Sequence, residues 1–266
     1  MIGIIQGRLT KAPKNRLQNF PKDWKKEFLL ANQCGYKYIE FFSERKFSNK
    51  NPIWSNKNIQ IYKNLAKING LKIYSFVDDY IISNSIYQAK NVKYIKKLIN
   101  NLKKLGIKKL ILPMCGKSDI NEKNFIKFVK PLQKICNLSY KNKIQVLLEG
   151  NFEPKLYFNL KKKIKCNNLY LVIDTGNRVN LKRNMYDDIQ LFKKHIKHIH
   201  IKDKNDLKKN VKLKDGNVDF NLLFKTLKKI RYKGNFTIES TRDNNPVLTA
   251  KKNLNFIKKK LTSLQG

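Results

Sequence analysis

Four side chains that can bind a metal ion each lie at or near the end of an apolar run. Glu149 follows IQVLL, Asp174 follows LYLVI, His200 lies in IKHIHI, and Glu239 follows NFTI. An unpaired carboxylate is costly to bury beside apolar residues, so such groups need a charged partner. Three carboxylates and one imidazole form an oxygen-rich donor set that suits Mn²⁺ or Mg²⁺, with Zn²⁺ or Co²⁺ as alternatives. If the four runs end at one place, the sequence predicts a site for one divalent metal ion.

The imidazole belongs to the segment HIKHIHIKDK, residues 195–204, which holds all three histidines of the protein. We expect a strand here that leads into a charged turn at 203–209. At the two-residue period of a strand, His198, His200 and Lys202 share one face. His200 is the metal-ligand candidate, whereas the deeper His198 is expected to be a core or supporting residue.

Eight short apolar segments are expected to be β-strands, and their Ile, Leu and Val content is typical of parallel strands buried on both faces. Longer amphipathic segments, expected to be helices, alternate with them. Gly106 is expected to cap the helix at 89–105, Asp219 to begin the one at 219–230, and Pro246 to begin the last, whose apolar stripe runs to Leu264. The expected strands are 2–6, 37–42, 72–77, 108–113, 144–149, 169–174, 196–201 and 235–240, and the other expected helices are 22–34, 56–69, 120–139, 154–164 and 184–194.

Eight β-then-α units without a linker or a break in composition predict an α/β protein, a closed (β/α)8 barrel forming a single domain over residues 1–266. An open doubly wound sheet is the alternative, but no G-x-G-x-x-G motif follows the first strand. In a barrel, the carboxyl ends of all strands lie on one rim. The four candidate ligands would therefore converge.

Composition limits the other function classes. The net charge of +39 would suit a protein that binds nucleic acid. However, the lysines recur along the faces of several expected helices and do not form one patch. We therefore expect a solvated basic surface without a specific nucleic-acid site. We see no apolar run of membrane-spanning length and no signal-peptide pattern, so a cytoplasmic protein without membrane contact is expected. The four cysteines lack metal-site spacing and are expected to be buried thiols.

The motifs resemble those of the xylose isomerase-like TIM barrel family, which includes ketose 3-epimerases, hydroxypyruvate isomerase, inosose dehydratase and endonuclease IV. The resemblance covers essentially the whole chain. It is carried by IGIIQGRL, GYKYIEFF, LLEGN, DTGN, HIHIKD, GNVDF and TIES, and the segments IQGRL and NPIW look most like bacterial sugar phosphate isomerase/epimerase proteins, some of which lie in cell-surface polysaccharide gene clusters.

The resemblance implies that Glu149, Asp174, His200 and Glu239 bind one divalent metal ion, and that Glu149 and Glu239 act as a catalytic acid/base pair. We therefore expect a metal-dependent isomerase or epimerase of a sugar or sugar phosphate, working by proton transfer through a metal-stabilised enediolate. A lyase of the inosose dehydratase type, using the same site, is the alternative, followed by a barrel that binds a sugar or polyanion without turnover. A nuclease is not expected, because Asn177 stands where endonuclease IV has a ligand histidine.

Other polar residues near the expected strand ends are candidates for substrate binding. Arginine suits bidentate contact with phosphate or carboxylate, and Lys202 has the strand phase of His200. Relatives often pair, so a homodimer remains open. The candidate substrate-binding residues are Gln6, Arg8, Trp54, Asn177, Lys202 and Arg242, and further strand-end residues are Glu40, Asp78, Asp79 and Cys115.

Overall fold

The computed structural model describes residues 1–13 and 17–262. Its eight long strands form a closed parallel barrel in the order β1-β10-β7-β6-β5-β4-β3-β2, which confirms the predicted (β/α)8 class. Most strand residues are buried, as their continuous apolar sequences predict. The strands are β1 (Ile2–Ile5), β2 (Tyr38–Ser43), β3 (Lys72–Asp78), β4 (Lys109–Pro113), β5 (Gln145–Glu149), β6 (Leu169–Asp174), β7 (Ile196–Ile201) and β10 (Asn235–Ile238).

The chain divides into two compact units. The first unit contains residues 1–39, 69–71 and 172–266, and the second contains residues 40–68 and 72–171. The division falls within β2 and β6. That residues 1–266 form a single domain remains a prediction.

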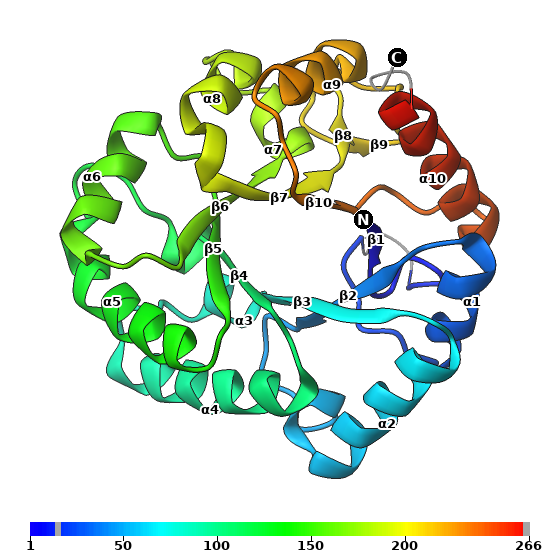
Figure 1. Ribbon diagram of the computed structural model, residues 1–266, viewed down its shortest axis with the longest axis horizontal. Helices are drawn as coiled ribbons and strands as arrows, with labels where there is room; N and C mark the ends of the chain where they lie inside the picture. The colour runs from blue at the N-terminus through cyan, green and yellow to red at the C-terminus, as the bar shows by residue number, and fades with distance from the viewer. Residues whose placement is uncertain (14–16, 263–266) are drawn as a thin grey trace. The chain divides into compact units, whose positions relative to one another are not determined.

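In the first unit, β10 pairs with β1 on one side and with β7 on the other. Helix α1 (Lys26–Cys34) packs against α10 (Pro246–Thr262), α10 against α9 (Phe220–Lys229), and α9 against α8 (Met185–Phe192) (Figure 1). Asp219 accepts a hydrogen bond from the backbone N–H of Leu222 and is the predicted N-cap of α9. The short helix α7 (Thr175–Val179) follows β6 directly.

In the second unit, β4 pairs with both β3 and β5. Helix α2 (Asn56–Ile68) packs against α4 (Ala89–Leu105), α4 against α5 (Ile126–Lys141), and α5 against α6 (Pro154–Ile164) (Figure 1). Helix α4 has the predicted bounds and ends at Gly106, whose φ of 94° is the left-handed conformation that glycine adopts without strain. A short helix, α3 (Tyr80–Ser83), and the 3-10 turns η1 (Pro52–Trp54) and η2 (Gly116–Ser118) complete the unit's helical elements.

Several sequence expectations differ from the structure. Helix α5 begins six residues later than expected, at Ile126. The helix expected at 184–194 ends earlier, at Phe192, and is followed by a 3-10 turn, η3 (Lys193–His195), while β7 has the bounds of the expected strand. The expected turn at 203–209 is partly wrong, because β8 (Asp203–Lys204) pairs with β9 (Asn210–Val211). Leu264 lies outside the described residues.

The hairpin of β8 and β9 depends on one carboxylate. Asp203 is fully buried and accepts hydrogen bonds from the backbone N–H groups of Lys204, Lys214, Gly216 and Val218. Four local donors satisfy a carboxylate that would otherwise be costly to bury. The charged residues after β7 therefore enclose Asp203 and do not form an open turn.

Two further expectations concern cysteines and membrane contact. Cys136 and Cys166 are buried as expected, but Cys34 is half-buried and Cys115 is exposed, so the expectation of buried thiols is wrong for Cys115. Cys115 lies beyond the end of β4, outside the apolar run that is buried. Among the described residues, the helices are all too short or too polar to cross a membrane.

Candidate metal-binding site

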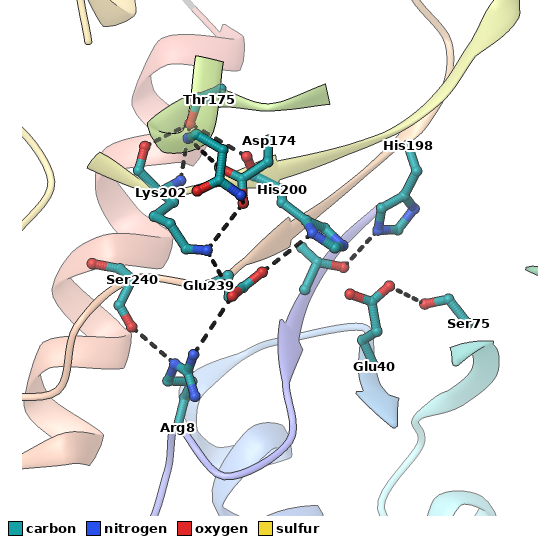
Figure 2. Close-up of polar contacts among 12 residues, drawn as sticks. Arg8, Glu40, Ser75, Asp174, Thr175, His198, His200, Lys202, Glu239 and Ser240 are labelled. Carbon is teal, nitrogen blue, oxygen red and sulfur yellow. Dashed lines mark hydrogen bonds and ion pairs between the residues drawn. The ribbon is translucent and has the colours of Figure 1, made fainter. Parts of the chain in front are cut away.

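Three of the four predicted ligands meet within the first unit. Asp174 is the last residue of β6, His200 lies near the end of β7, and Glu239 directly follows β10. Pairing of Thr237 with His200 sets the register of β10 on β7, and the backbone N–H of Glu239 continues it by donating to the Ile201 carbonyl at 2.9 Å. One ligand atom from each of the three lies within 4.8 Å of the others. Figure 2 shows the group and its polar contacts.

Asp174 ends a strand and caps a helix. Its Oδ1 accepts a hydrogen bond from the backbone N–H of Asn177 at 2.8 Å, which satisfies a donor in the first turn of α7. Its Oδ2 accepts from Asn177 Nδ2 at 2.9 Å and from Lys202 Nζ at 3.0 Å. Both oxygens of this ligand candidate are therefore fixed in direction.

Glu239 is surrounded by positive charge. Its Oε1 lies 2.8 Å from Lys202 Nζ and 3.8 Å from Arg8 Nη2, and its Oε2 lies 3.2 Å from His200 Nδ1. Burial acts to raise the pKa of Glu239, but the charge of Lys202, the hydrogen bond and charge of His200, and the charge of Arg8 together hold it well below its usual range. Glu239 is therefore ionised at ordinary pH, as a metal ligand must be.

His198 lies deeper in the first unit. It is fully buried, and its Nε2 lies 2.8 Å from the hydroxyl of Thr237, which also lies 2.9 Å from the hydroxyl of Tyr38. Its ring meets those of Tyr38 and His200 edge to face. These contacts fit the core role expected for His198.

The predicted substrate-binding arginines contact the backbone. Arg8 donates to the carbonyl of Ser240 at 3.0 Å and to that of Leu17 at 2.6 Å. Arg242 donates to the same Leu17 carbonyl at 2.8 Å and to the carbonyl of Gly7. The two guanidinium groups thus tie the loop after β1 to the segment after β10, a role that single-residue patterns in the sequence do not reveal.

A buried carboxylate also holds this loop in place. Glu27 of α1 accepts hydrogen bonds from Gly7 N at 2.6 Å, from Leu9 N at 3.2 Å and from the Thr10 hydroxyl at 2.9 Å. Gln6, the first residue after β1, is completely buried. Glu27 could not be recognised as a buried residue from the sequence, because acidic residues are common in the first turn of a helix and are mostly exposed.

In the second unit, the fourth predicted ligand ends its strand as expected. Glu149 is the last residue of β5, pairs with Pro113 of β4 and is half-buried. Its backbone carbonyl accepts a hydrogen bond from the N–H of Met114 at 2.6 Å.

Two other candidates of the second unit lie in a polar and aromatic cluster. The ring of Trp54 lies 5.3 Å from that of Phe47 and 5.2 Å from that of Tyr94. The Tyr94 hydroxyl donates to Asp78 Oδ1 at 3.1 Å, and the Ser43 hydroxyl donates to the same atom at 2.5 Å. Burial raises the pKa of Asp78 to about 6, although both hydrogen bonds act to lower it.

The donor set of the first unit fits a hard divalent cation. Two carboxylates and an imidazole, converging at strand ends with their oxygens oriented by hydrogen bonds, are ligands that Mn²⁺ or Mg²⁺ accepts. Thr175 and Asn177, the second and fourth residues of DTGN, are the residues around this set whose contacts the sequence did not predict.

The sequence and the fold both match known proteins. The family model for xylose isomerase-like TIM barrels matches residues 28–260. Among solved structures, L-ribulose 3-epimerase is similar with a TM-score of 0.79 and 17% identity, covering 99% of this chain and 95% of the other. D-Psicose 3-epimerase from Clostridium cellulolyticum H10, solved with D-tagatose, is similar with a TM-score of 0.76 and 15% identity, covering 98% and 99%.

A third structure was solved with a metal ion. It is a xylose isomerase-like TIM barrel protein from Mycobacterium smegmatis in complex with magnesium, with a TM-score of 0.72 and 17% identity, covering 99% of this chain and 97% of the other. A search of curated proteins finds no significant sequence match. At these identities, the structural likeness establishes the fold.

Proposed function

This chain belongs to the xylose isomerase-like TIM barrel family, and we propose that it is a divalent-metal-dependent isomerase or epimerase acting on a sugar or sugar phosphate. The observation that carries the proposal is the convergence of Asp174, His200 and Glu239 at the ends of three strands. The similar structures that are sugar 3-epimerases support this activity.

We propose Glu149 as the fourth ligand. It closes β5, which is next to β6 in the strand order, just as Asp174 closes β6. The resulting three carboxylates and one imidazole favour Mn²⁺ or Mg²⁺, and the magnesium complex of a similar structure supports the choice. When bound, the ion would polarise the substrate carbonyl and acidify the neighbouring C–H bond.

In this proposal, Glu149 and Glu239 move the proton. One carboxylate removes it from the carbon beside the carbonyl, and the other returns it. Return to the opposite face of the same carbon gives epimerisation, whereas return to the neighbouring carbon gives isomerisation. The charges around Glu239 keep it ionised, as a base must be, and they also make it a weaker base than a free carboxylate.

Roles in substrate binding remain predictions for Gln6, Arg8, Trp54, Asn177, Lys202 and Arg242. Arg8 and Arg242 hold the loop after β1 through hydrogen bonds to backbone carbonyls. We therefore propose that they affect substrate binding partly by keeping this loop in place. The binding partner that we propose for this protein is its small-molecule substrate, the sugar or sugar phosphate.

Deuterium exchange tests the proposal. Metal-stripped protein with added Mn²⁺ is incubated in D₂O with a panel of free ketoses and ketose phosphates, and deuterium uptake at carbon is followed by NMR and mass spectrometry. Glu149→Gln and Glu239→Gln are each expected to slow exchange by about 10²- to 10⁴-fold. Glu122→Gln, at an exposed site, is the matched control and should leave the rate unchanged.

The possible results separate the candidate functions. The absence of metal-dependent exchange across the whole panel would contradict the isomerase and epimerase proposal. Loss of water from a substrate, seen as a mass decrease, would instead identify the lyase alternative. Sugar binding that is unchanged in both glutamine variants, without turnover of any substrate, would indicate a binding protein.

A further inference from the structure

We propose that the ammonium group of Lys202 is a built-in counter-cation of the candidate metal site. It offsets one of the two negative charges of Asp174 and Glu239 before a divalent ion binds, and it thereby lowers the affinity of the site for that ion. The inference rests on the metal site of the proposed function but concerns a different property, the strength and exchange of metal binding.

The position of Lys202 carries the inference. Its Nζ lies 3.0 Å from Asp174 Oδ2 and 2.8 Å from Glu239 Oε1, so one ammonium bridges two ligand candidates from different strands (Figure 2). The Lys202 side chain is 8% exposed, and those of Asp174 and Glu239 are 2% and 13% exposed. At such burial the attraction is weakly screened by water, and the two carboxylates would repel each other without the ammonium.

The DTGN motif builds a cradle for this lysine. The Thr175 hydroxyl accepts a hydrogen bond from Lys202 N at 3.0 Å and lies 2.5 Å from the Lys202 carbonyl oxygen. At Gly176, a Cβ atom would lie 2.9 Å from Lys202 Cγ and 3.2 Å from its carbonyl carbon, so only glycine leaves room for the lysine there. Three consecutive residues of the motif thus fix Lys202. Asp174 binds its ammonium group, Thr175 binds its backbone, and Gly176 leaves room for its stem.

Such a fixed cation affects a metal ion in a predictable direction. Lys202 and a divalent ion are both attracted to Asp174 and Glu239 and repel each other across a short distance in a poorly hydrated site. A purely positioning lysine would have the opposite effect, because losing an orienting partner weakens metal binding. The sign of the change in metal affinity therefore distinguishes a counter-cation from a positioning residue.

The test compares Lys202→Met with the wild type and with Lys204→Met. Methionine keeps an unbranched stem but removes the charge. Lys204 lies two residues further along and donates to the neutral amide of Asn177 at 2.7 Å, which makes it a matched control. Mn²⁺ affinity of each metal-stripped full-length protein is measured by calorimetry at fixed pH and ionic strength, and thermal unfolding is followed in EDTA and in Mn²⁺.

We expect Lys202→Met to bind Mn²⁺ more tightly by on the order of tenfold or more. Its unfolding temperature in EDTA should be lower than that of the wild type, because two buried carboxylates lose their counter-charge, and Mn²⁺ should raise it by more. Lys204→Met should not bind Mn²⁺ more tightly than the wild type. If Lys202→Met does not fold, Lys202→Gln replaces it in both measurements.

Equal or weaker Mn²⁺ binding by the folded Lys202 variant overturns the inference, while Mn²⁺ binding by the wild type upholds the metal site of the proposed function. If neither protein binds Mn²⁺, Mg²⁺, Zn²⁺ or Co²⁺, both the metal site and the inference fail. Tight binding by the variant together with weak or undetectable binding by the wild type supports the inference in its strongest form.

Discussion

Asn177 donates two hydrogen bonds to the carboxylate of Asp174, one from its backbone N–H at 2.8 Å and one from its side-chain Nδ2 at 2.9 Å. Lys204 Nζ lies 2.7 Å from the amide oxygen of Asn177, which fixes the direction in which the amide points. Asn177 therefore connects the β8–β9 hairpin to the ligand candidate at the end of β6.

Replacing Asn177 should weaken metal binding. Asn177→Ala keeps the backbone bond but removes the side-chain bond that orients Asp174 Oδ2, and loss of such a supporting partner lowers metal affinity by about 10- to 100-fold. Calorimetric titration with Mn²⁺ checks this. Asn180→Ala is the control, since Asn180 donates to the Asn205 carbonyl within the same region. An unchanged affinity in Asn177→Ala would contradict the prediction and would show that the backbone N–H of Asn177 and Lys202 Nζ suffice to orient Asp174.

Asp78 should make stability depend on pH. Its pKa is raised from 3.8 to about 6 in the folded protein because it is buried. Between these values the unfolded chain has lost the proton that the folded protein still binds, so the free energy of unfolding falls as pH rises. This contribution is fully present below pH 4, is lost between about pH 4 and pH 6, and amounts to roughly 3 kcal/mol at most.

Asp78→Asn removes the titrating group while its amide oxygen can still accept from Ser43 and Tyr94. The free energy of unfolding of the variant, relative to wild type, should therefore increase by up to roughly 3 kcal/mol from pH 4 to pH 7. Urea unfolding at several pH values measures it. Asp119→Asn, at an exposed site, should show no such trend, and parallel curves for Asp78→Asn and wild type would contradict the prediction.

Glu27 should be essential to the loop after β1. Glu27→Ala leaves the buried N–H groups of Gly7 and Leu9 without their acceptor, and we expect a loss of about 2–4 kcal/mol in the free energy of unfolding. Glu27→Gln keeps one acceptor oxygen and should lose less. Chemical denaturation compares the two, and equal losses would mean that the charge, and not the acceptor geometry, is what the loop requires.

Thr237 should stabilise the interior of the first unit through its hydroxyl. Thr237→Val keeps the shape but removes the contact to His198 Nε2, which should cost about 1–3 kcal/mol. Tyr38 keeps its hydrogen bond to the Phe236 carbonyl at 2.8 Å. Thr237→Ser retains the hydroxyl and should be closer to wild type in thermal unfolding. A valine variant as stable as the serine variant would contradict the assignment.

The sequence predicted the strands well because each is a short apolar run, and it predicted the C-terminal end of α4 because Gly106 can adopt a positive φ. It placed Asp174, His200 and Glu239 at strand ends, which is sufficient to bring them together once the fold class is known. It did not predict the contacts of Arg8, Arg242 and Glu27, because these side chains bind backbone groups that have no sequence signature. The start of α5 was missed because its first turn lacks a capping side chain.

The pairing of β1 with β10 has a consequence for synthesis on the ribosome. Ile2 pairs with Phe236, so the pairing of β1 with β10 cannot form until more than two hundred further residues have been made, whereas β2, the other neighbour of β1 in the strand order, is made early. Strands β3, β4 and β5 pair with one another within residues 72–149 and can assemble much earlier. The second unit is therefore expected to gain structure while the edge of β1 that pairs with β10 is still open, and the nascent chain must keep that edge of the apolar segment IGII from aggregating during that interval.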